Sequence, residues 1–266
     1  MGQTVIFGDV HGQADQLKEV IFMAQERFGT DLDLYTVGDL IDRGPDSSGV
    51  IELCIKYGVR GVYGNHDQWL HQFIQKRIFD PMCLHPVMGG SSTLSSYGVD
   101  WYTSLSKHPE DERLAHIEIA NNLERLLPES HKDFVLSLKP FMNIEVDDKT
   151  YWLLHAGLKE SIAKPFNIGK ISDLDLLSAV TDGVGVNNIL WPSPGLGRHD
   201  KDPINLHKFK DGRQILGHSI CWYPQLNDFF CAIDTGCGTA YPWTLTALAL
   251  PSLEIIQVER FNKTGR

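Results

Sequence analysis

The chain has 266 residues, of which 42% are hydrophobic and 22% charged, and its formal net charge is −10. This composition is typical of a globular protein. The negative charge disfavours nonspecific binding to a nucleic acid polymer, which needs a basic surface. No uncharged apolar run reaches about 18 residues, so neither a membrane span nor a membrane partner is expected.

The start of the chain leads directly into the apolar run Thr4–Phe7, with no basic segment or cleavage site before it. A secretory signal is therefore not expected. The cysteines are odd in number and form no CxxC pair, which fits reduced thiols. Together these features predict a cytoplasmic protein.

Apolar, often β-branched runs predict strands, and helical periods lie between the early runs. The predicted strands are Thr4–Phe7, Leu32–Val37, Arg60–Tyr63, Tyr151–Leu154, Arg213–Leu216, Phe229–Ile233, Leu245–Leu250 and Glu254–Val258. One helical period runs from Leu17 to Phe28 and another from Val50 to Tyr57. This early alternation predicts βαβ units with parallel strands. The last strands lack intervening helices, which indicates antiparallel additions and a second sheet packed on the first.

Residues 68–140 differ from the rest because they lack strand-like runs. They contain predicted helices at 68–79, 111–127 and 128–138. We interpret this segment as a helical insertion into a single domain that spans residues 1–266.

Five short motifs place polar residues where strand-like runs end. They are Gly8-Asp9-Val10-His11-Gly12, Gly38-Asp39-Leu40-Ile41-Asp42-Arg43-Gly44, Gly64-Asn65-His66-Asp67, His155-Ala156-Gly157 and Gly217-His218-Ser219. Asp, His and Asn supply oxygen and nitrogen ligands for divalent cations, and arginine supplies a planar fork for phosphate. Ligands of open α/β sheets bind beyond the carboxyl ends of the strands. We therefore expect the motifs to meet at one edge and form a two-metal phosphoester hydrolase.

These ordered motifs resemble those of the calcineurin-like metallophosphoesterase superfamily, over roughly residues 4 to 240. The complete Asp42-Arg43-Gly44 and the absence of a second histidine after His218 make the chain most similar to the phosphoprotein phosphatase family. That family includes bacterial serine/threonine phosphatases and diadenosine tetraphosphatases, and segments 88–98 and 233–237 also resemble its bacterial members. The resemblance implies an α/β (α+β) fold, a metallophosphoesterase β-sandwich of two mixed sheets flanked by helices, with the helical insertion beside the active site.

The resemblance also implies which residues hold the metals. Asp9 and His11 would bind the first metal, and Asp39 would bridge both. The second metal would be completed by Asn65, His155 and His218. Two Mn²⁺ ions are the expected cofactors, and a mixed Fe/Zn pair is also compatible with these ligands.

Catalytic roles follow from the same resemblance. A hydroxide shared by the metals would attack phosphorus directly. His66 would act as general acid toward the leaving oxygen, and Asp42 would orient and charge-stabilise it.

Arg43 and Asn65 would contact the phosphate oxygens. A second phosphate arginine is expected in the loop after residues 189–191. Arg198 is favoured over Arg213, because Arg213 begins a predicted strand.

Three functions are compatible with this site. The favoured one is a serine/threonine protein phosphatase-like phosphomonoesterase that acts on phosphoproteins or small phosphate esters. The alternative is a bis(5'-nucleosyl)-tetraphosphatase that cleaves a dinucleotide such as diadenosine tetraphosphate. The candidate adenine-stacking residues are then Trp69, Tyr97, Trp101, Trp191 and Trp222. A non-catalytic phosphate-binding module is disfavoured, because every ligand type is kept together with the proposed acid.

Other residues near the motifs are interpreted as structural. Asp67 is expected to support the loop that carries His66, without binding a metal. Asp234 and Cys237 are expected to stabilise the fold. The SAPNYC loop of the eukaryotic enzymes is absent, and Asp234-Thr235-Gly236-Cys237-Gly238 occupies that region. No eukaryotic-type regulatory subunit is therefore expected as a partner.

Overall fold

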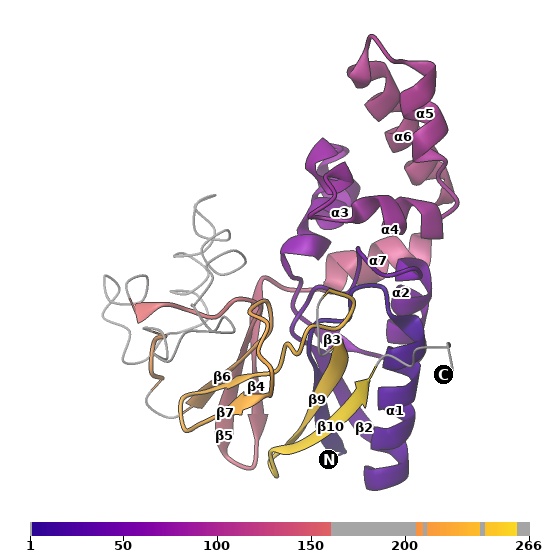
Figure 1. Ribbon diagram of the computed structural model, residues 1–266. Helices are drawn as coiled ribbons and strands as arrows, with labels where there is room; N and C mark the ends of the chain where they lie inside the picture. Colours follow the sequence, from indigo (N-terminus) through magenta and orange to yellow (C-terminus); the bar gives the residue numbers. More distant parts are fainter. Residues whose placement is uncertain (1, 161–205, 210–211, 240–242, 260–266) are drawn as a thin grey trace.

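The computed structural model describes the chain except for residues 1, 161–205, 210–211, 240–242 and 260–266. Within the described part, two five-stranded sheets lie beside each other, with helices on the far side of the first sheet and at one end (Figure 1). Both sheets contain parallel and antiparallel pairs. The fold expected from the sequence is thus confirmed. No helix among the described residues is long and apolar enough to cross a membrane.

The first sheet has the strand order β10-β9-β1-β2-β3. It begins with β1 (Gln3–Phe7), α1 (Ala14–Phe28), β2 (Leu32–Thr36), α2 (Ser47–Lys56) and β3 (Arg60–Gly61). β1, β2 and β3 are parallel because a helical crossover joins each to the next. β9 (Thr244–Leu250) and β10 (Glu254–Glu259) extend the sheet as the expected antiparallel additions.

The second sheet has the order β4-β5-β6-β8-β7. Its strands are β4 (Phe141–Val146), β5 (Lys149–Leu154), β6 (Gly212–Leu216), β7 (Gln225–Leu226) and β8 (Phe230–Ala232). The sequence patterns do not predict β4 or β7. β4 lies at the edge of the sheet, and the exposed Asn143 and Glu145 interrupt its apolar pattern. β7 is short and exposed.

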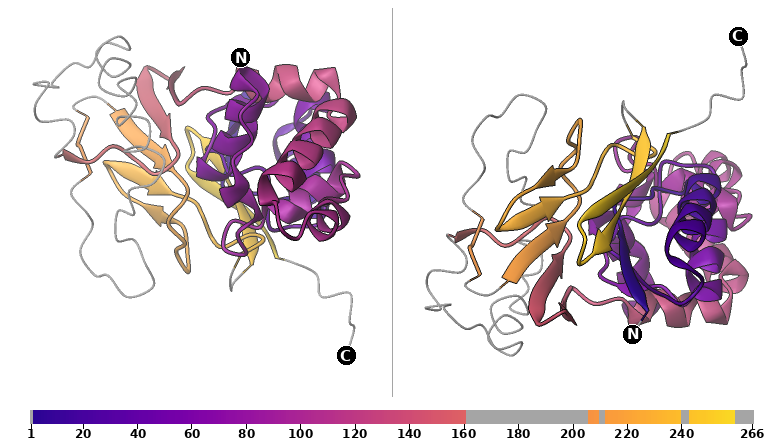
Figure 2. Two further views of the ribbon diagram at one scale, coloured as in Figure 1. Left: turned by 90° about the horizontal axis from the view of Figure 1, so that it is seen from above. Right: turned by 90° about the horizontal axis from the view of Figure 1, so that it is seen from below.

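The core follows the alternation of side chains along the strands. Val5 and Phe7 of β1 pack with residues of α1 such as Leu17, whereas Ile6 packs with Leu153 of the second sheet. Successive side chains of a strand point to opposite faces. The first sheet is therefore covered by helices on one face and by the second sheet on the other (Figure 2).

Helices fill the chain between β3 and β4. They are α3 (Asn65–Lys76), the 3₁₀ helix η1 (Pro81–Leu84), α4 (Gly90–Ser96), α5 (Trp101–Lys107), α6 (Glu112–Leu126) and α7 (Glu129–Ser137). α3, α6 and α7 are the predicted helices, and the short α4 and α5 are not predicted. α3 begins at Asn65, earlier than expected, because the Asp67 side chain caps its first turn by accepting a hydrogen bond from Gly64 N.

A mutation in β1 tests this core. We expect Phe7→Ala to lower the free energy of unfolding by about 3–5 kcal/mol, because the ring is fully buried and its loss leaves a cavity. Urea denaturation followed by circular dichroism measures this change. Tyr223→Ala is the control, since Tyr223 is 76% exposed, and its effect should stay within about 0.5 kcal/mol. Equal losses in both variants would contradict the burial assigned to Phe7.

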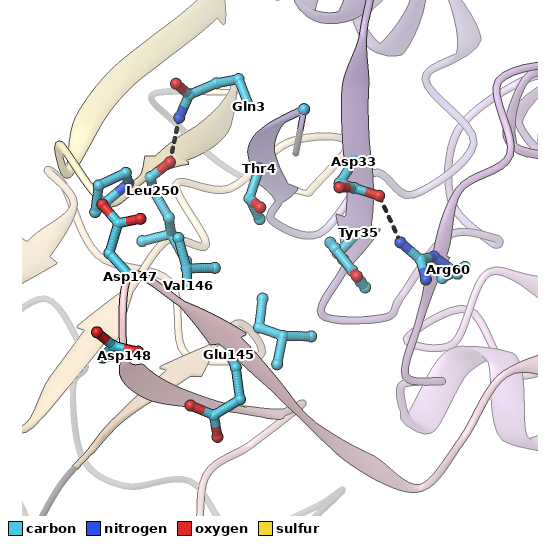
Figure 3. Close-up of a pocket in the computed structure, with 13 residues that line it drawn as sticks. Gln3, Thr4, Asp33, Tyr35, Arg60, Glu145, Val146, Asp147, Asp148 and Leu250 are labelled. Carbon is cyan, nitrogen blue, oxygen red and sulfur yellow. Dashed lines mark hydrogen bonds and ion pairs between the residues drawn. The ribbon is translucent and has the colours of Figure 1, made fainter.

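One large cavity lies away from the motifs. It has a volume of about 850 Å³ and is lined by the starts of β1 and β2, by Arg60 and by the β4–β5 turn (Figure 3). Asp33 and Arg60 form an ion pair of 2.7 Å at its wall. None of the five motifs contributes a residue to this lining, so this cavity is not the site that the motifs form.

Candidate active site

The motifs converge at the carboxyl ends of strands from both sheets. Asp9 and His11 follow β1, Asp39 follows β2, and Asn65 opens α3 after β3. His155 and His218 follow β5 and β6 of the second sheet. A cavity of about 170 Å³ at this point is lined by Asp9, His11, Asp39, Arg43, Asn65, His66, Val87, Met88, His218, Ile220 and Asp234.

The backbone of these turns is unusual. His11, Asp39, Asp42, Arg43 and His218 all have φ between 47° and 72°, a region that residues other than glycine seldom adopt. Such conformations persist only where the surroundings hold them, and they cluster at functional sites. The motif glycines have a different role, because their lack of a side chain lets neighbouring carboxylates approach the backbone closely. A methyl group at Gly64 would collide with the Asp39 carboxylate, and one at Gly217 would collide with that of Asp9.

Asp39 occupies the centre of the site. Its Oδ2 lies 3.6 Å from His11 Nε2, and its Oδ1 lies 3.4 Å from His155 Nε2. Asp39 also belongs to two groups whose ligand atoms lie within 4.8 Å of one another, one with His11 and His66 and the other with His155 and His218. Because its two oxygens face different histidines, this carboxylate is placed to be shared by two cations.

Asn65 joins the histidines of the second sheet to this centre. Its Oδ1 lies 3.0 Å from His155 Nε2 and 2.9 Å from His218 Nδ1. The backbone N–H of His218 donates to the Asp9 carboxylate, with a shortest distance of 3.1 Å. The first and last motifs in the sequence are thus linked within the site.

The histidine rings are oriented by backbone carbonyls. His11 Nδ1 lies 3.1 Å from Ile41 O, and His155 Nδ1 lies 2.9 Å from Val37 O. A ring nitrogen that faces a carbonyl carries the proton, so Nε2 of each ring is the nitrogen directed at Asp39. This arrangement is typical of metal-binding histidines. Burial also lowers the pKa of His11 well below its ordinary value, which keeps the ring neutral and able to act as a ligand.

Several buried carboxylates meet at this point. Burial, Asp234 and Asp39 raise the pKa of Asp9 well above its ordinary value. Burial raises the pKa of Asp234 to about 6. Concentrated, buried negative charge is unfavourable unless cations compensate it. The oxygen and nitrogen donors therefore fit divalent metal ions.

Burial alone would lower the pKa of His155, but the Asp39 carboxylate raises it above its ordinary value. A cation bound between the two side chains would replace this ring proton, as metal binding to histidine generally does.

A second cluster lies beside the metal-binding residues. His66 Nδ1 lies 2.9 Å from Asp42 Oδ2, and Trp69 Nε1 donates to the same oxygen at 3.1 Å. Asp42 is fully buried, and burial raises its pKa although these hydrogen bonds oppose the shift. With Nδ1 held by Asp42, Nε2 is the nitrogen of His66 left for chemistry in the cavity.

Asp67 has the supporting role that the sequence predicts. Its Oδ1 accepts hydrogen bonds from Leu40 N at 2.9 Å and Ile41 N at 3.3 Å, and its Oδ2 accepts from Gly64 N at 2.8 Å. It therefore ties the second motif to the third without facing the cavity.

The arginines are distributed unequally. Arg43 lines the cavity, and its Nη1 lies 2.7 Å from His11 Nε2. Arg213 is the second residue of β6, at the opposite end of that strand from His218, and pairs with Asp228 at 3.4 Å. It therefore lies too far from the cavity to contact phosphate there. Arg198 lies outside the described residues.

Asp234 is a site residue that the sequence interpretation misses. From the sequence it is interpreted as a structural residue. In the structure it is buried and lines the cavity. It follows β8 as the motif residues follow their strands, so the same rule would have identified it. Cys237 is buried with its Sγ 3.3 Å from Val10 O, as a structural residue would be.

The fold and this donor set define a metallophosphoesterase. The family model for calcineurin-like phosphoesterases matches residues 3–225, and the chain belongs to this family. It is therefore a phosphoric ester hydrolase of a family that uses divalent metals.

Named relatives fall into two groups. The chain is 26% identical to bis(5'-nucleosyl)-tetraphosphatase PrpE [asymmetrical] of Oceanobacillus iheyensis over 268 residues. This alignment covers 95% of this chain and 90% of that protein. It is 36% identical to serine/threonine-protein phosphatase 1 of Salmonella typhimurium, over 38% of this chain and 41% of that protein. A symmetrical bis(5'-nucleosyl)-tetraphosphatase of Pectobacterium carotovorum is 45% identical over 24% of this chain and 23% of its own length.

A solved structure supports the fold. A crystal structure provisionally described as a diadenosine tetraphosphatase aligns with a TM-score of 0.55 and 21% identity, over 98% of this chain and 95% of that one. At this identity the likeness concerns the fold alone.

Proposed function

We propose that this protein hydrolyses phosphoric esters at a centre of two divalent metals. The observation that carries the proposal is Asp39, whose two carboxylate oxygens face His11 and His155 at 3.6 and 3.4 Å. Asp9 and His11 would hold the first metal, and Asn65, His155 and His218 the second. When bound, the metals polarise the phosphoryl group and make water a strong nucleophile at neutral pH. Mn²⁺ is the metal we expect to support the highest activity, tested by adding Mn²⁺, Zn²⁺ or Fe²⁺ to protein stripped with a chelator.

The protein's own side chains complete the reaction. Arg43 binds phosphate oxygens through its planar guanidinium. His66 donates a proton from Nε2 to the leaving oxygen, and Asp42 fixes the ring by its bond to Nδ1. The proton therefore reaches the oxygen as its bond to phosphorus breaks.

Our first candidate substrate is a phosphomonoester, such as a phosphoserine or phosphothreonine side chain. The similarity to a serine/threonine-protein phosphatase over part of the chain supports this candidate.

The second candidate is a bis(5'-nucleosyl) tetraphosphate, and its support is comparable. The similarity to PrpE covers nearly the whole chain. Among the candidate stacking residues, Trp69 and Tyr97 are buried, whereas Trp222, which follows His218 in the sequence, is 48% exposed. Trp191 lies outside the described residues, and we propose Trp222 as the stacking residue among the candidates that the structure describes.

Product-resolved turnover distinguishes the two substrates. With Mn²⁺ present, a phosphothreonine peptide and diadenosine tetraphosphate are compared at equal concentration. Faster release of phosphate from the peptide supports the phosphatase. Faster cleavage of the dinucleotide, to ADP or to ATP and AMP, supports the tetraphosphatase. Turnover of neither substrate with any metal would contradict the proposed function and favour a phosphate-binding module.

The second phosphate-binding arginine can be tested by mutation. We expect Arg198→Ala to raise KM roughly tenfold or more, because a charged hydrogen bond to phosphate contributes about 1.5–3 kcal/mol. It should also weaken inhibition by inorganic phosphate. Arg213→Ala is the matched control and should leave both values nearly unchanged. The reverse result would show that Arg198 is the wrong choice.

We also propose that the chain is one domain with residues 68–140 as an insertion, because α3 carries Asn65 and His66 into the site. Calorimetry should then show one unfolding transition. Two separated transitions would contradict a single domain.

A further inference from the structure

The segment Met88–Gly98 resembles bacterial family members in sequence, but it has no role in the proposed function described above. It contains α4, which lies between η1 and α5 in the sequence and belongs to the helical region of the structure (Figure 1). Two of its residues, Gly89 and Thr93, contact the Asp42-Arg43 turn directly. These contacts connect the insertion to the proposed proton donor and to the phosphate-binding arginine.

Thr93 holds Asp42 from two sides. Its Oγ1 donates to Asp42 Oδ1 at 2.7 Å and accepts from Asp42 N at 2.9 Å. Ser47 Oγ lies 2.9 Å from the same hydroxyl. A threonine hydroxyl has one proton and two lone pairs, so these contacts use it fully. Thr93 is completely buried, and water cannot readily replace it.

The geometry of the carboxylate links Thr93 to His66. Asp42 Oδ2 is the oxygen that faces His66 Nδ1 at 2.9 Å, while Thr93 binds Oδ1. Rotation of the carboxylate would therefore break the bond to His66. By fixing one oxygen, Thr93 fixes the other.

Gly89 holds Arg43, the residue that follows Asp42. Its carbonyl accepts a hydrogen bond from Arg43 N at 3.1 Å. Gly89 has φ 72°, and a methyl group there would lie 3.0 Å from both Arg43 N and Arg43 Cγ. The contact thus needs a residue without a side chain. Asp42 and Arg43 are themselves at φ 72° and 65°, conformations that neighbouring groups must maintain.

We propose that Thr93 is a positioning residue for proton donation and that Gly89 is a positioning residue for phosphate binding. Thr93 acts through Asp42 on His66, and Gly89 acts through the backbone of Arg43. The proposal rests on the proposed roles of His66 and Arg43. It predicts that two contacts on one short segment have separable kinetic effects.

The test compares two phosphate monoesters in the presence of Mn²⁺. para-Nitrophenyl phosphate has a leaving group that departs readily without a proton. Phenyl phosphate has a more basic leaving group, with a pKa of about 10 as in tyrosine. We expect Thr93→Val to lower kcat for phenyl phosphate roughly tenfold or more, a part of the total effect of a general acid. The loss for para-nitrophenyl phosphate should be below about threefold.

Two further variants separate positioning from folding. Thr93→Ser keeps the hydroxyl and should restore kcat for phenyl phosphate to within about threefold of the wild type. Ser96→Ala is the matched control on the same helix, because Ser96 bonds to Ser48 and Thr93 backbone groups and not to Asp42. It should affect the two esters equally and weakly. If circular dichroism shows that Thr93→Val does not fold, Thr93→Ala provides the same comparison.

Gly89→Ala tests the proposed effect of Gly89 on phosphate binding. It should raise KM for both esters about tenfold and leave the ratio of their kcat values unchanged, since Arg43 and not His66 is displaced.

The outcomes also separate this proposal from the proposed function. Equal losses on both esters in Thr93→Val, or a Thr93→Ser variant as impaired as Thr93→Val, would overturn the role of Thr93. A changed kcat ratio in Gly89→Ala without a change in KM would overturn that of Gly89. His66→Asn is the reference, because it should show the ester dependence most strongly. If His66→Asn shows none, the proposed role of His66 fails first.

Discussion

Asp39→Asn should abolish turnover and weaken the binding of both metals by at least about 10²-fold. Mutations of groups that only support metal ligands already cost about 10–100-fold, and Asp39 faces both histidine groups directly. The amide keeps the shape of the side chain but removes the negative charge that two bound cations would share. Metal content after dialysis, measured by mass spectrometry together with isothermal titration, reports each site.

The control for this variant is Asp228→Asn. Asp228 is exposed and pairs with Arg213 at 3.4 Å, away from the cavity. The Asp228→Asn variant should bind the same number of metals per chain as the wild type, which we expect to be two. Loss of a single metal in Asp39→Asn would indicate that Asp39 is a ligand of one site only. Full occupancy of both sites would show that it is not a bridging ligand.

The fold is predicted well where one residue pattern decides the structure. The buried runs before Asp9, Asp39 and His218 are strands, because continuous apolar sequence fits a sheet covered on both faces. β4 is missed because it is an edge strand, in which the exposed Asn143 and Glu145 reflect contact with solvent. The short helix α4 is missed because its Gly-Ser-Ser-Thr sequence has low helical propensity. Its contacts with Asp42 stabilise it instead.

The sequence also predicts part of the site but not all of it. The ends of strands give Asp9, Asp39 and His155 because topology brings them to one edge. Sequence alone does not show distances, and so it does not reveal that Asp234 lines the same cavity. Nor does it reveal Thr93, whose contact with Asp42 crosses 51 positions of the chain. Such tertiary contacts follow from packing, which no local pattern records.

His66→Asn should retain both metals and lower kcat for phenyl phosphate by at least about 10²-fold, the lower end for a general acid. Asparagine can accept or donate a hydrogen bond but cannot transfer a proton to the leaving oxygen. With para-nitrophenyl phosphate the loss should be much smaller, because that leaving group needs little protonation. Steady-state kinetics on both esters, with metal content measured on the same samples, tests this role.

The geometry also offers a competing role for His66. Its ligand nitrogen lies within 4.8 Å of those of His11 and Asp39, so it could bind a metal in place of Asp9. The two roles make opposite predictions. A ligand would lose a metal on substitution and slow both esters equally, whereas a proton donor keeps the metals and slows the basic leaving group. The bond from Nδ1 to the buried Asp42 favours the donor, because it fixes the ring with Nε2 as the nitrogen left for the leaving oxygen. Loss of one metal in His66→Asn, with Asp9→Asn retaining both, would reverse this assignment.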